Sequence, residues 1–105
     1  MEVTDDNFEE KVVEASKEKL VVVDFWAEWC GPCNMLAPTL DNVVESFGDK
    51  VVLVKLNVDQ NPEIANKFNV NAIPDVKFFK DGNLVDSFVG VQSEDKIKGL
   101  IEKNL

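Results

Sequence analysis

Apolar and polar residues follow one another along this chain with a period that changes several times, and each change marks the end of a predicted element. The runs 20–26 and 51–58 are apolar at almost every position, which is typical of strands covered on both faces. The runs 76–80 and 84–89 flank Asp81-Gly82-Asn83, and a short turn that contains glycine predicts an antiparallel hairpin.

The segments beside these strands carry apolar residues at helical spacing. The first predicted helix begins at a cap, Thr4 or Asp5, and ends before Lys19. The other predicted helices cover Pro32 to Gly48, Pro62 to Phe68 and Glu94 to Lys103, the last of them capped by Ser93. The apolar residues at helical spacing in the second of them are Met35, Leu36, Leu40, Val43, Val44 and Phe47. Alternating strands and helices favour right-handed parallel crossovers. We therefore predict an α/β fold, with a central mixed sheet flanked by helices on both faces.

The charge of the chain narrows the classes of function. Asp and Glu number 20 against 11 Lys, with neither Arg nor His, which gives a net charge of -9. Nucleic acid is not expected as a partner of so acidic a chain. Without histidine the commonest general base and metal ligand is missing, so catalysis must use Cys, Asp, Glu and Lys.

Length and composition predict one domain over residues 1–105, because 45% of the residues are hydrophobic and no Gly-, Ser- or Pro-rich linker interrupts them. The acidic and polar start lacks the basic and apolar parts of a secretory signal. The longest fully apolar run, 20–23, is far too short to cross a bilayer. We therefore expect a cytoplasmic protein with no membrane contact, where a Cys-x-x-Cys pair is normally redox-active or binds metal.

The two cysteines of the chain form such a pair, Cys30-Gly31-Pro32-Cys33, directly after the first predicted strand. A disulfide across so short a loop restricts the unfolded chain very little, so its purpose is chemical rather than structural. A reversible disulfide carries two electrons. Two alternatives stay open: half of a zinc site completed by a second copy of the chain, since zinc needs four ligands, and an inert pair.

The position of each cysteine suggests its role in thiol exchange. Cys30 lies in the turn from strand to helix, where free N–H groups and the positive end of the helix dipole favour a thiolate. It is the expected nucleophile. Cys33 lies further into the helix and is expected to attack the mixed disulfide formed by Cys30, which makes it the resolving thiol. No metal ligand set is expected from these residues.

Asp24 interrupts the first buried strand, and a carboxyl group in such a place either finds a partner or stays protonated. A buried acid near Cys33 can shuttle a proton, and Lys55 on the second strand is the expected partner of Asp24. A tolerated polar pair with a purely structural role is the alternative.

Together these residues resemble the thioredoxin family over essentially the whole chain. The matching segments are Trp26 to Cys33 with the buried Asp24, Pro38, Lys55 to Asp59, Ile73-Pro74, Phe79 to Gly82 and Val89-Gly90. The resemblance implies the thioredoxin fold, with Cys30 as nucleophile, Cys33 as resolving cysteine and Asp24 with Lys55 as the proton-handling pair. Pro74 would be a cis-proline opposite the disulfide. The implied docking surface for substrates consists of Trp29, Gly31, Pro32, Val58, Ala72, Ile73, Pro74, Val89 and Gly90.

The resemblance also implies a function. The chain would be a general protein disulfide reductase, an enzyme that takes electrons from a thioredoxin reductase and passes them to disulfide-bearing substrate proteins. We expect a monomer with no bound cofactor, whose only redox group is the Cys30–Cys33 disulfide. An extended substrate strand would pair with main-chain groups near Ile73.

Two positions depart from the family pattern. Asp75 stands where threonine is usual. If its carboxylate faces the active site, its charge would disfavour the Cys30 thiolate and make the protein a stronger reductant. If the carboxylate faces away, it would have little effect. Ala72 stands where glycine is frequent and is expected to narrow the docking groove.

Two other functions compete with a reductase. The same fold can serve as a disulfide oxidant or isomerase, but Gly-Pro between the cysteines, the absence of histidine there and the missing signal segment favour reduction. The domain can also serve as a structural subunit of a complex in which the thiols are incidental. Replacing both cysteines with serine separates this last role from a reductase.

Overall fold

The protein is described over all 105 residues by a computed structural model. In chain order the elements are a π-helical segment Glu9–Glu14 with a 3-10 turn Ala15–Lys17, β1 Leu20–Trp26, α1 Gly31–Ser46, a 3-10 turn Gly48–Lys50, β2 Val51–Asn57, α2 Pro62–Lys67, β3 Asp75–Lys80, β4 Asn83–Val89 and α3 Glu94–Asn104. We call residues 9–17 the N-terminal helix. Every strand and helix predicted from the pattern is present, with ends that differ by one or two residues at most, apart from the start of the N-terminal helix.

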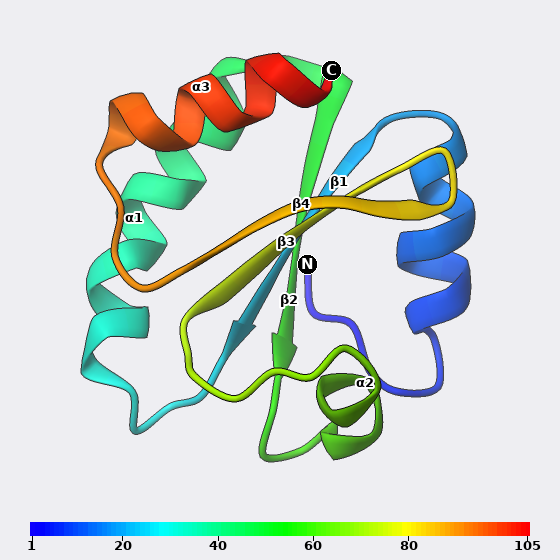
Figure 1. The fold of residues 1–105 in the computed structure, drawn as a ribbon, viewed down its shortest axis with the longest axis vertical. Coiled ribbons are helices and arrows are strands. Elements are labelled where there is room, and N and C mark those ends of the chain that lie inside the picture. The colour runs from blue at the N-terminus through cyan, green and yellow to red at the C-terminus, as the bar shows by residue number, and fades with distance from the viewer.

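The four strands form one sheet in the order β2-β1-β3-β4 (Figure 1). β1 pairs with β2 in parallel and with β3 in antiparallel, and β3 pairs with β4 in antiparallel. α1 and α3 cover one face of this sheet, and the N-terminal helix and α2 cover the other (Figure 1). The expected mixed sheet with helices on both faces is therefore confirmed.

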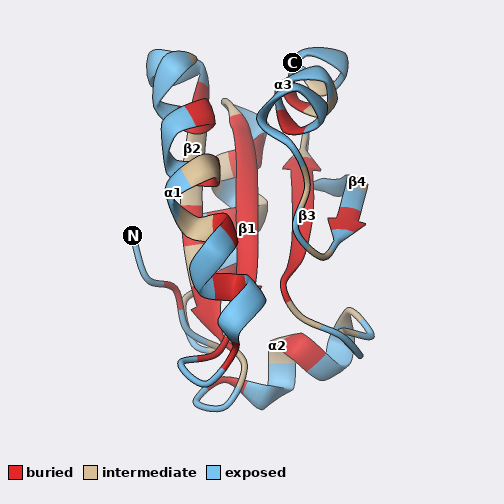
Figure 2. Ribbon diagram, turned by 90° about the vertical axis from the view of Figure 1, so that its left-hand side faces the viewer, coloured by how far each residue is buried: buried red, intermediate tan, exposed pale blue.

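β1 is the centre of the molecule because its side chains enter both hydrophobic cores. Leu20 and Val22 pack with α1 and α3, whereas Val21, Val23 and Phe25 pack with the N-terminal helix and α2. This alternation follows from the two-residue period of a strand. Figure 2 shows β1 and β3 buried along almost their whole length, which explains why the first predicted strand is apolar at nearly every position.

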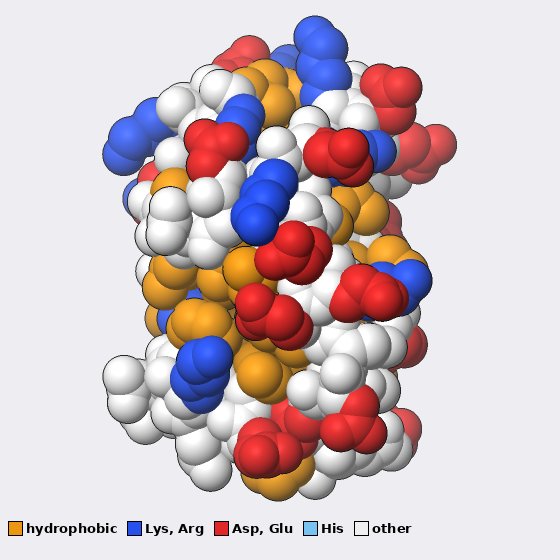
Figure 3. Space-filling view, turned by 90° about the vertical axis from the view of Figure 1, so that its right-hand side faces the viewer, with side chains coloured by type: hydrophobic (Ala, Val, Ile, Leu, Met, Phe, Trp, Pro, Cys, Tyr) orange, Lys and Arg blue, Asp and Glu red, His pale blue; other side chains and the backbone are white.

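The exposed surface is strongly charged. On the side that carries the N-terminal helix, acidic side chains lie at the top, centre, right and bottom of the view, hydrophobic side chains gather at the centre left, and no continuous basic patch is visible (Figure 3). None of the helices is both long and apolar enough to span a bilayer. Of the apolar residues at helical spacing in α1, Met35 does not enter the core and is 69% exposed.

The two expected N-terminal caps have different partners. Thr4 and Asn7 bond reciprocally, with the Asn7 N–H donating to the Thr4 hydroxyl and the Thr4 N–H donating to the Asn7 amide oxygen. Asp5 instead caps α2, because its carboxylate accepts the N–H of Ile64 at 2.9 Å and that of Glu63 at 3.2 Å. The chain entering the first helix is thereby fixed to a helix almost sixty residues further on.

Removing this cap is expected to lower stability. Asp5→Ala leaves two N–H groups of α2 without an acceptor and should lower the free energy of unfolding by about 1 kcal/mol. The measurement is urea denaturation, with Asp6→Ala as the control that removes the same charge from an exposed position. An equal loss in both variants would mean that the cap contributes nothing beyond charge.

Candidate active site

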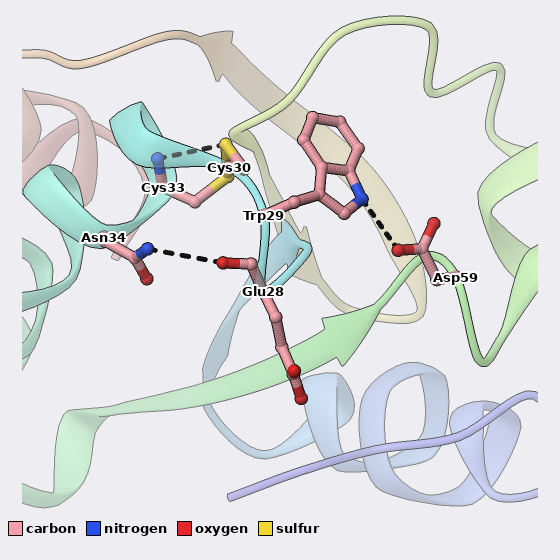
Figure 4. Close-up of a disulfide and its surroundings, with 6 residues drawn as sticks. All are labelled: Glu28, Trp29, Cys30, Cys33, Asn34 and Asp59. Atoms are coloured by element: carbon pink, nitrogen blue, oxygen red, sulfur yellow. Dashed lines mark hydrogen bonds between the residues drawn. A yellow bond between two sulfur atoms is a disulfide. The ribbon is translucent and has the colours of Figure 1, made fainter.

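The two cysteines lie at the start of α1, just beyond the end of β1. Cys30 is the residue before the helix, with an extended backbone at φ -85° and ψ 103°, and Pro32 occupies the first turn. The two Cα atoms are 5.2 Å apart, and the sulfur atoms are joined in a disulfide. The N–H of Cys33 donates to the Cys30 sulfur at 3.1 Å (Figure 4).

This geometry indicates which sulfur becomes the stable thiolate. The Cys30 sulfur already accepts a helix N–H in the disulfide and sits where the helix dipole is positive, so a negative charge on it would be stabilised. The Cys33 sulfur belongs to a residue that is 2% exposed and packs with Ala27 below the turn. Cys30 is itself only 3% exposed, so the two sulfurs differ in the helix N–H that Cys30 accepts and not in burial.

Below Cys33 lies a small cavity that contains the buried acid. It has a volume of about 170 Å³ and is lined by Glu2, Asp24, Trp26, Cys33, Asn34, Ala37 and Lys55. Asp24 is 2% exposed, and neither its Oδ1 nor the Trp26 Nε1 has a hydrogen-bond partner. Burial raises the pKa of Asp24 to about 6, against the lowering effect of the Lys55 charge. Asp24 is therefore a carboxyl group that can take up and release a proton near neutral pH, in the same cavity as Cys33.

Lys55 is the register partner of Asp24 across β1 and β2, but its ammonium group forms a different ion pair. Its Nζ lies 3.5 Å from Oδ1 of Asp41, an exposed residue of α1. The expected direct pairing with Asp24 is thus replaced by a longer electrostatic interaction across the cavity. The reason is that Asp41 offers the lysine a partner that stays in contact with water, which spares the desolvation of a second charge.

Trp29 stands at the surface beside the disulfide and is 71% exposed. Its indole N–H donates to the Asp59 carboxylate at 2.8 Å, which fixes the ring (Figure 4). Trp29 also lines a groove of about 360 Å³, together with Val58, Val70, Asn71, Ala72 and Ile73. Four residues expected on the docking surface thus share one groove.

The remaining docking residues lie between the two cysteines, directly before β3 and at the end of β4. Gly31 and Pro32 are exposed in the first turn of α1. The Ile73–Pro74 peptide bond is cis, and Ile73 packs against the cysteines. The carbonyl of Pro74 accepts the N–H of Gly90 at 2.8 Å, beside the exposed Val89.

Asp75 faces away from the proton-handling cavity. Its neighbours Val76 and Phe78 enter the core under α1, so Asp75 and Lys77 point to the opposite face of the sheet, together with Phe79. Asp75 Oδ1 lies 3.2 Å from Lys77 Nζ, and both side chains are almost fully buried. Burial raises the pKa of Asp75, and the nearby ammonium of Lys77 opposes this. Because its carboxyl group is paired with Lys77 on the sheet face opposite Asp24, we expect Asp75 to have little influence on the disulfide.

Asp75→Thr is accordingly expected to change the reduction potential by less than the roughly 30 mV that corresponds to a tenfold change in equilibrium constant. The variant should be less stable, because Lys77 is left buried without its counterion. Equilibration with a glutathione buffer measures the potential, and the double variant Asp75→Thr/Lys77→Met controls for the unpaired lysine. A shift well above 30 mV would show that the Asp75 charge reaches Cys30 after all.

Three residues near the site have contacts that the sequence did not predict. Asp59 fixes Trp29, Asp41 pairs with Lys55, and Glu2 lines the Asp24 cavity. Each lies at least fourteen positions from its partner along the chain, and exposed acidic residues are common in this sequence. No group of three or more His, Cys, Asp or Glu side chains is arranged to hold a metal ion.

Comparisons with known proteins agree with this geometry. The family model described as Thioredoxin matches residues 1–103. Thioredoxin 1 of Synechococcus elongatus is 42% identical over 103 residues, which are 98% of this chain and 94% of the relative. Thioredoxin of Staphylococcus haemolyticus is 43% identical over 105 residues, covering 100% of this chain and 97% of the relative. Thioredoxin of Rickettsia prowazekii is 39% identical over 103 residues, covering 98% and 96%.

Proposed function

Because the chain belongs to the thioredoxin family and is a thiol–disulfide oxidoreductase, we propose that it works as a general protein disulfide reductase in the cytoplasm. The observation that carries this proposal is the Cys30–Cys33 disulfide at the start of α1, with Asp24 in the cavity below it. We propose that a single monomeric domain, residues 1–105, takes electrons from a thioredoxin reductase and needs no bound cofactor.

The first step of the proposed reaction uses Cys30. In the reduced protein its thiolate attacks one sulfur of a substrate disulfide, which forms a Cys30–substrate bond and breaks the substrate S–S bond. The other substrate sulfur leaves as a thiolate and takes a proton from water. The helix N-terminus favours the Cys30 thiolate and so lowers the free energy of the attacking species.

The second step uses Cys33 and Asp24. Cys33 transfers its proton to the Asp24 carboxylate through the shared cavity and attacks the Cys30 sulfur. A Cys30–Cys33 bond forms, the bond to the substrate breaks, and the second substrate thiolate leaves. The substrate disulfide has then gained two electrons and this protein has lost two. Because the pKa of Asp24 is about 6, the carboxylate is mostly free to accept the proton at neutral pH.

The proposed docking surface gives the substrate its position. An extended segment beside the substrate disulfide would lie in the groove between Trp29 and Ile73 and pair with main-chain groups near Ile73. Trp29 offers an apolar ring held by Asp59, so little side-chain freedom is lost on binding.

The test is reduction of insulin disulfides with candidate reductases supplied one at a time. A reductase produces reduced insulin at the expense of the reductase's electron donor, and the double variant Cys30→Ser/Cys33→Ser does not. If no reductase supports turnover but the protein oxidises dithiols rapidly, the chain is an oxidant. Full biological activity of the double variant would instead indicate a structural subunit.

A further inference from the structure

The first three residues form a strap along the outer edge of β2. The N–H of Val3 donates to the carbonyl of Lys55, and the N–H of Lys55 donates to the carbonyl of Met1, both at 2.8 Å. Glu2 is thereby paired in parallel register with Lys55. Val3 is 1% exposed and anchors the strap in the core beside the sheet, and the N-terminus lies next to β2 (Figure 1).

The strap brings a carboxylate to the cavity of Asp24. Glu2 is exposed, yet it lines the same cavity of about 170 Å³ as Asp24, Cys33 and Lys55. Two buried polar atoms without partners, Asp24 Oδ1 and Trp26 Nε1, belong to residues of the same lining. Four of the seven residues that line the cavity are polar, and its volume is large enough for water.

The charges around Asp24 come from three elements, and they oppose one another. Lys55 on β2 favours the carboxylate, whereas Asp41 on α1 and Glu2 on the strap favour the protonated acid. The positive charge of Lys55 is shared with Asp41, 3.5 Å from its Nζ. On the remaining side, the β3 neighbour of Asp24 is Val76, which carries no charge. Glu2 is therefore an acidic group at this cavity that is not ion-paired.

We propose that Glu2, held at the cavity by the strap, is a positioning residue for the proton that Asp24 receives from Cys33. Its negative charge makes Asp24 a stronger base and keeps the transferred proton on the carboxyl group while Cys33 attacks Cys30. The inference rests on the proton-accepting role proposed above for Asp24. It assigns to the N-terminal strap a part in the second step of disulfide exchange.

Glu2→Gln tests this inference, with Glu9→Gln as a control that removes the same charge from an exposed residue of the N-terminal helix. Both substitutions are made in the parent and in Asp24→Asn. The first readout is the titration of the Asp24 carboxyl carbon by NMR in the oxidised protein. The second is the pH profile of the resolution step, followed as release of substrate thiol from a preformed mixed disulfide on Cys30.

Glu2→Gln is expected to lower the pKa of Asp24 and to move the acid limb of the resolution profile to lower pH. The rate of the resolution step on the plateau of this profile is expected to fall by about twofold, because a weaker base takes the Cys33 proton less readily. Glu9→Gln is expected to change neither the pKa of Asp24 nor the pH profile. In the Asp24→Asn background, neither substitution should change the rate of the resolution step. A purely structural role for Glu2 would alter stability but would not move the profile.

Two results overturn the inference, and they are distinguishable. If Glu2→Gln and Glu9→Gln give the same titration and profile while Asp24→Asn still removes the acid limb, only the role of Glu2 is lost. If Asp24→Asn leaves the profile of the parent unchanged, the proton-accepting role of Asp24 fails and the role of Glu2 fails with it.

Discussion

Cys33→Ser is expected to stop turnover and to leave the protein joined to its substrate. Cys30 keeps its place before α1 and still attacks the substrate disulfide, but no second thiol can release the product. Turnover in the insulin assay should fall to the level without protein, while a mixed disulfide accumulates. Intact mass spectrometry under non-reducing conditions measures the trapped species.

Cys30→Ser is the matched control for this trap. It keeps only the Cys33 thiol. The two cysteines are almost equally buried, but the Cys33 sulfur accepts no helix N–H that would stabilise a thiolate, so no mixed disulfide should form at a comparable rate. Equal trapping by the two variants would contradict the assignment of nucleophile and resolving thiol.

Asp24→Asn is expected to make the protein more stable and slower. At neutral pH the parent must keep a charged carboxylate in a position that is only 2% exposed, and the amide removes that cost. The pKa of Asp24 is raised from 3.8 to about 6, which corresponds to about 3 kcal/mol between the two protonation states. We expect the variant to gain up to this amount at pH 7, less whatever the unpaired amide costs.

The pH dependence of this gain has a definite sign. A carboxyl group whose pKa is raised on folding binds more protons in the native state between the two pKa values, so its contribution to stability is greatest below 3.8 and is lost as pH rises toward 6. The parent and Asp24→Asn should therefore be most similar in stability below pH 3.8, where the Asp24 side chain is mostly neutral in both the folded and the unfolded state. The difference should grow up to about pH 6 and then stay constant. Urea denaturation of both proteins across this range measures it.

The kinetic effect of Asp24→Asn should appear in the second step. Without the Asp24 carboxylate, Cys33 loses the buried base beside it, and the resolution step should slow by about a hundredfold at pH 7, as loss of a positioned general base implies. The attack of Cys30 on the substrate should change much less. Equal resolution rates across pH in the two proteins would exclude the proton shuttle.

The strands and helices could be predicted from the sequence because the residues buried in this fold recur at the spacing of the element that carries them. β1 enters both cores, so it is apolar at nearly every position, and the turn of the hairpin requires residues that tolerate positive φ, as Asp81 and Gly82 do at 54° and 83°. The cysteine pair was equally readable, because its two residues are neighbours on a helix that starts between them.

The partners of the charged residues could not be predicted in the same way. Asp24 was recognised as anomalous because a charge inside an apolar run is visible in one strand, but the ion pair of Lys55 with Asp41 depends on the crossing of α1 over β2. Asp5 was expected to cap the first helix and caps α2, because an exposed acidic side chain bonds to whichever free N–H groups the fold brings near. These pairings depend on contacts between elements that are distant in the sequence, so no hydrophobic or polar pattern along the chain indicates them.

The reduction potential of the Cys30–Cys33 pair tests the central claim most directly, because it decides the direction in which the two electrons flow. The protein is equilibrated with buffers of known potential at pH 7, and the dithiol and disulfide forms are quantified after alkylation. If the protein is a reductase, its reduction potential should lie near that of thioredoxin, about -270 mV. A potential at or above about -180 mV, as in protein disulfide isomerase, would contradict the proposed function.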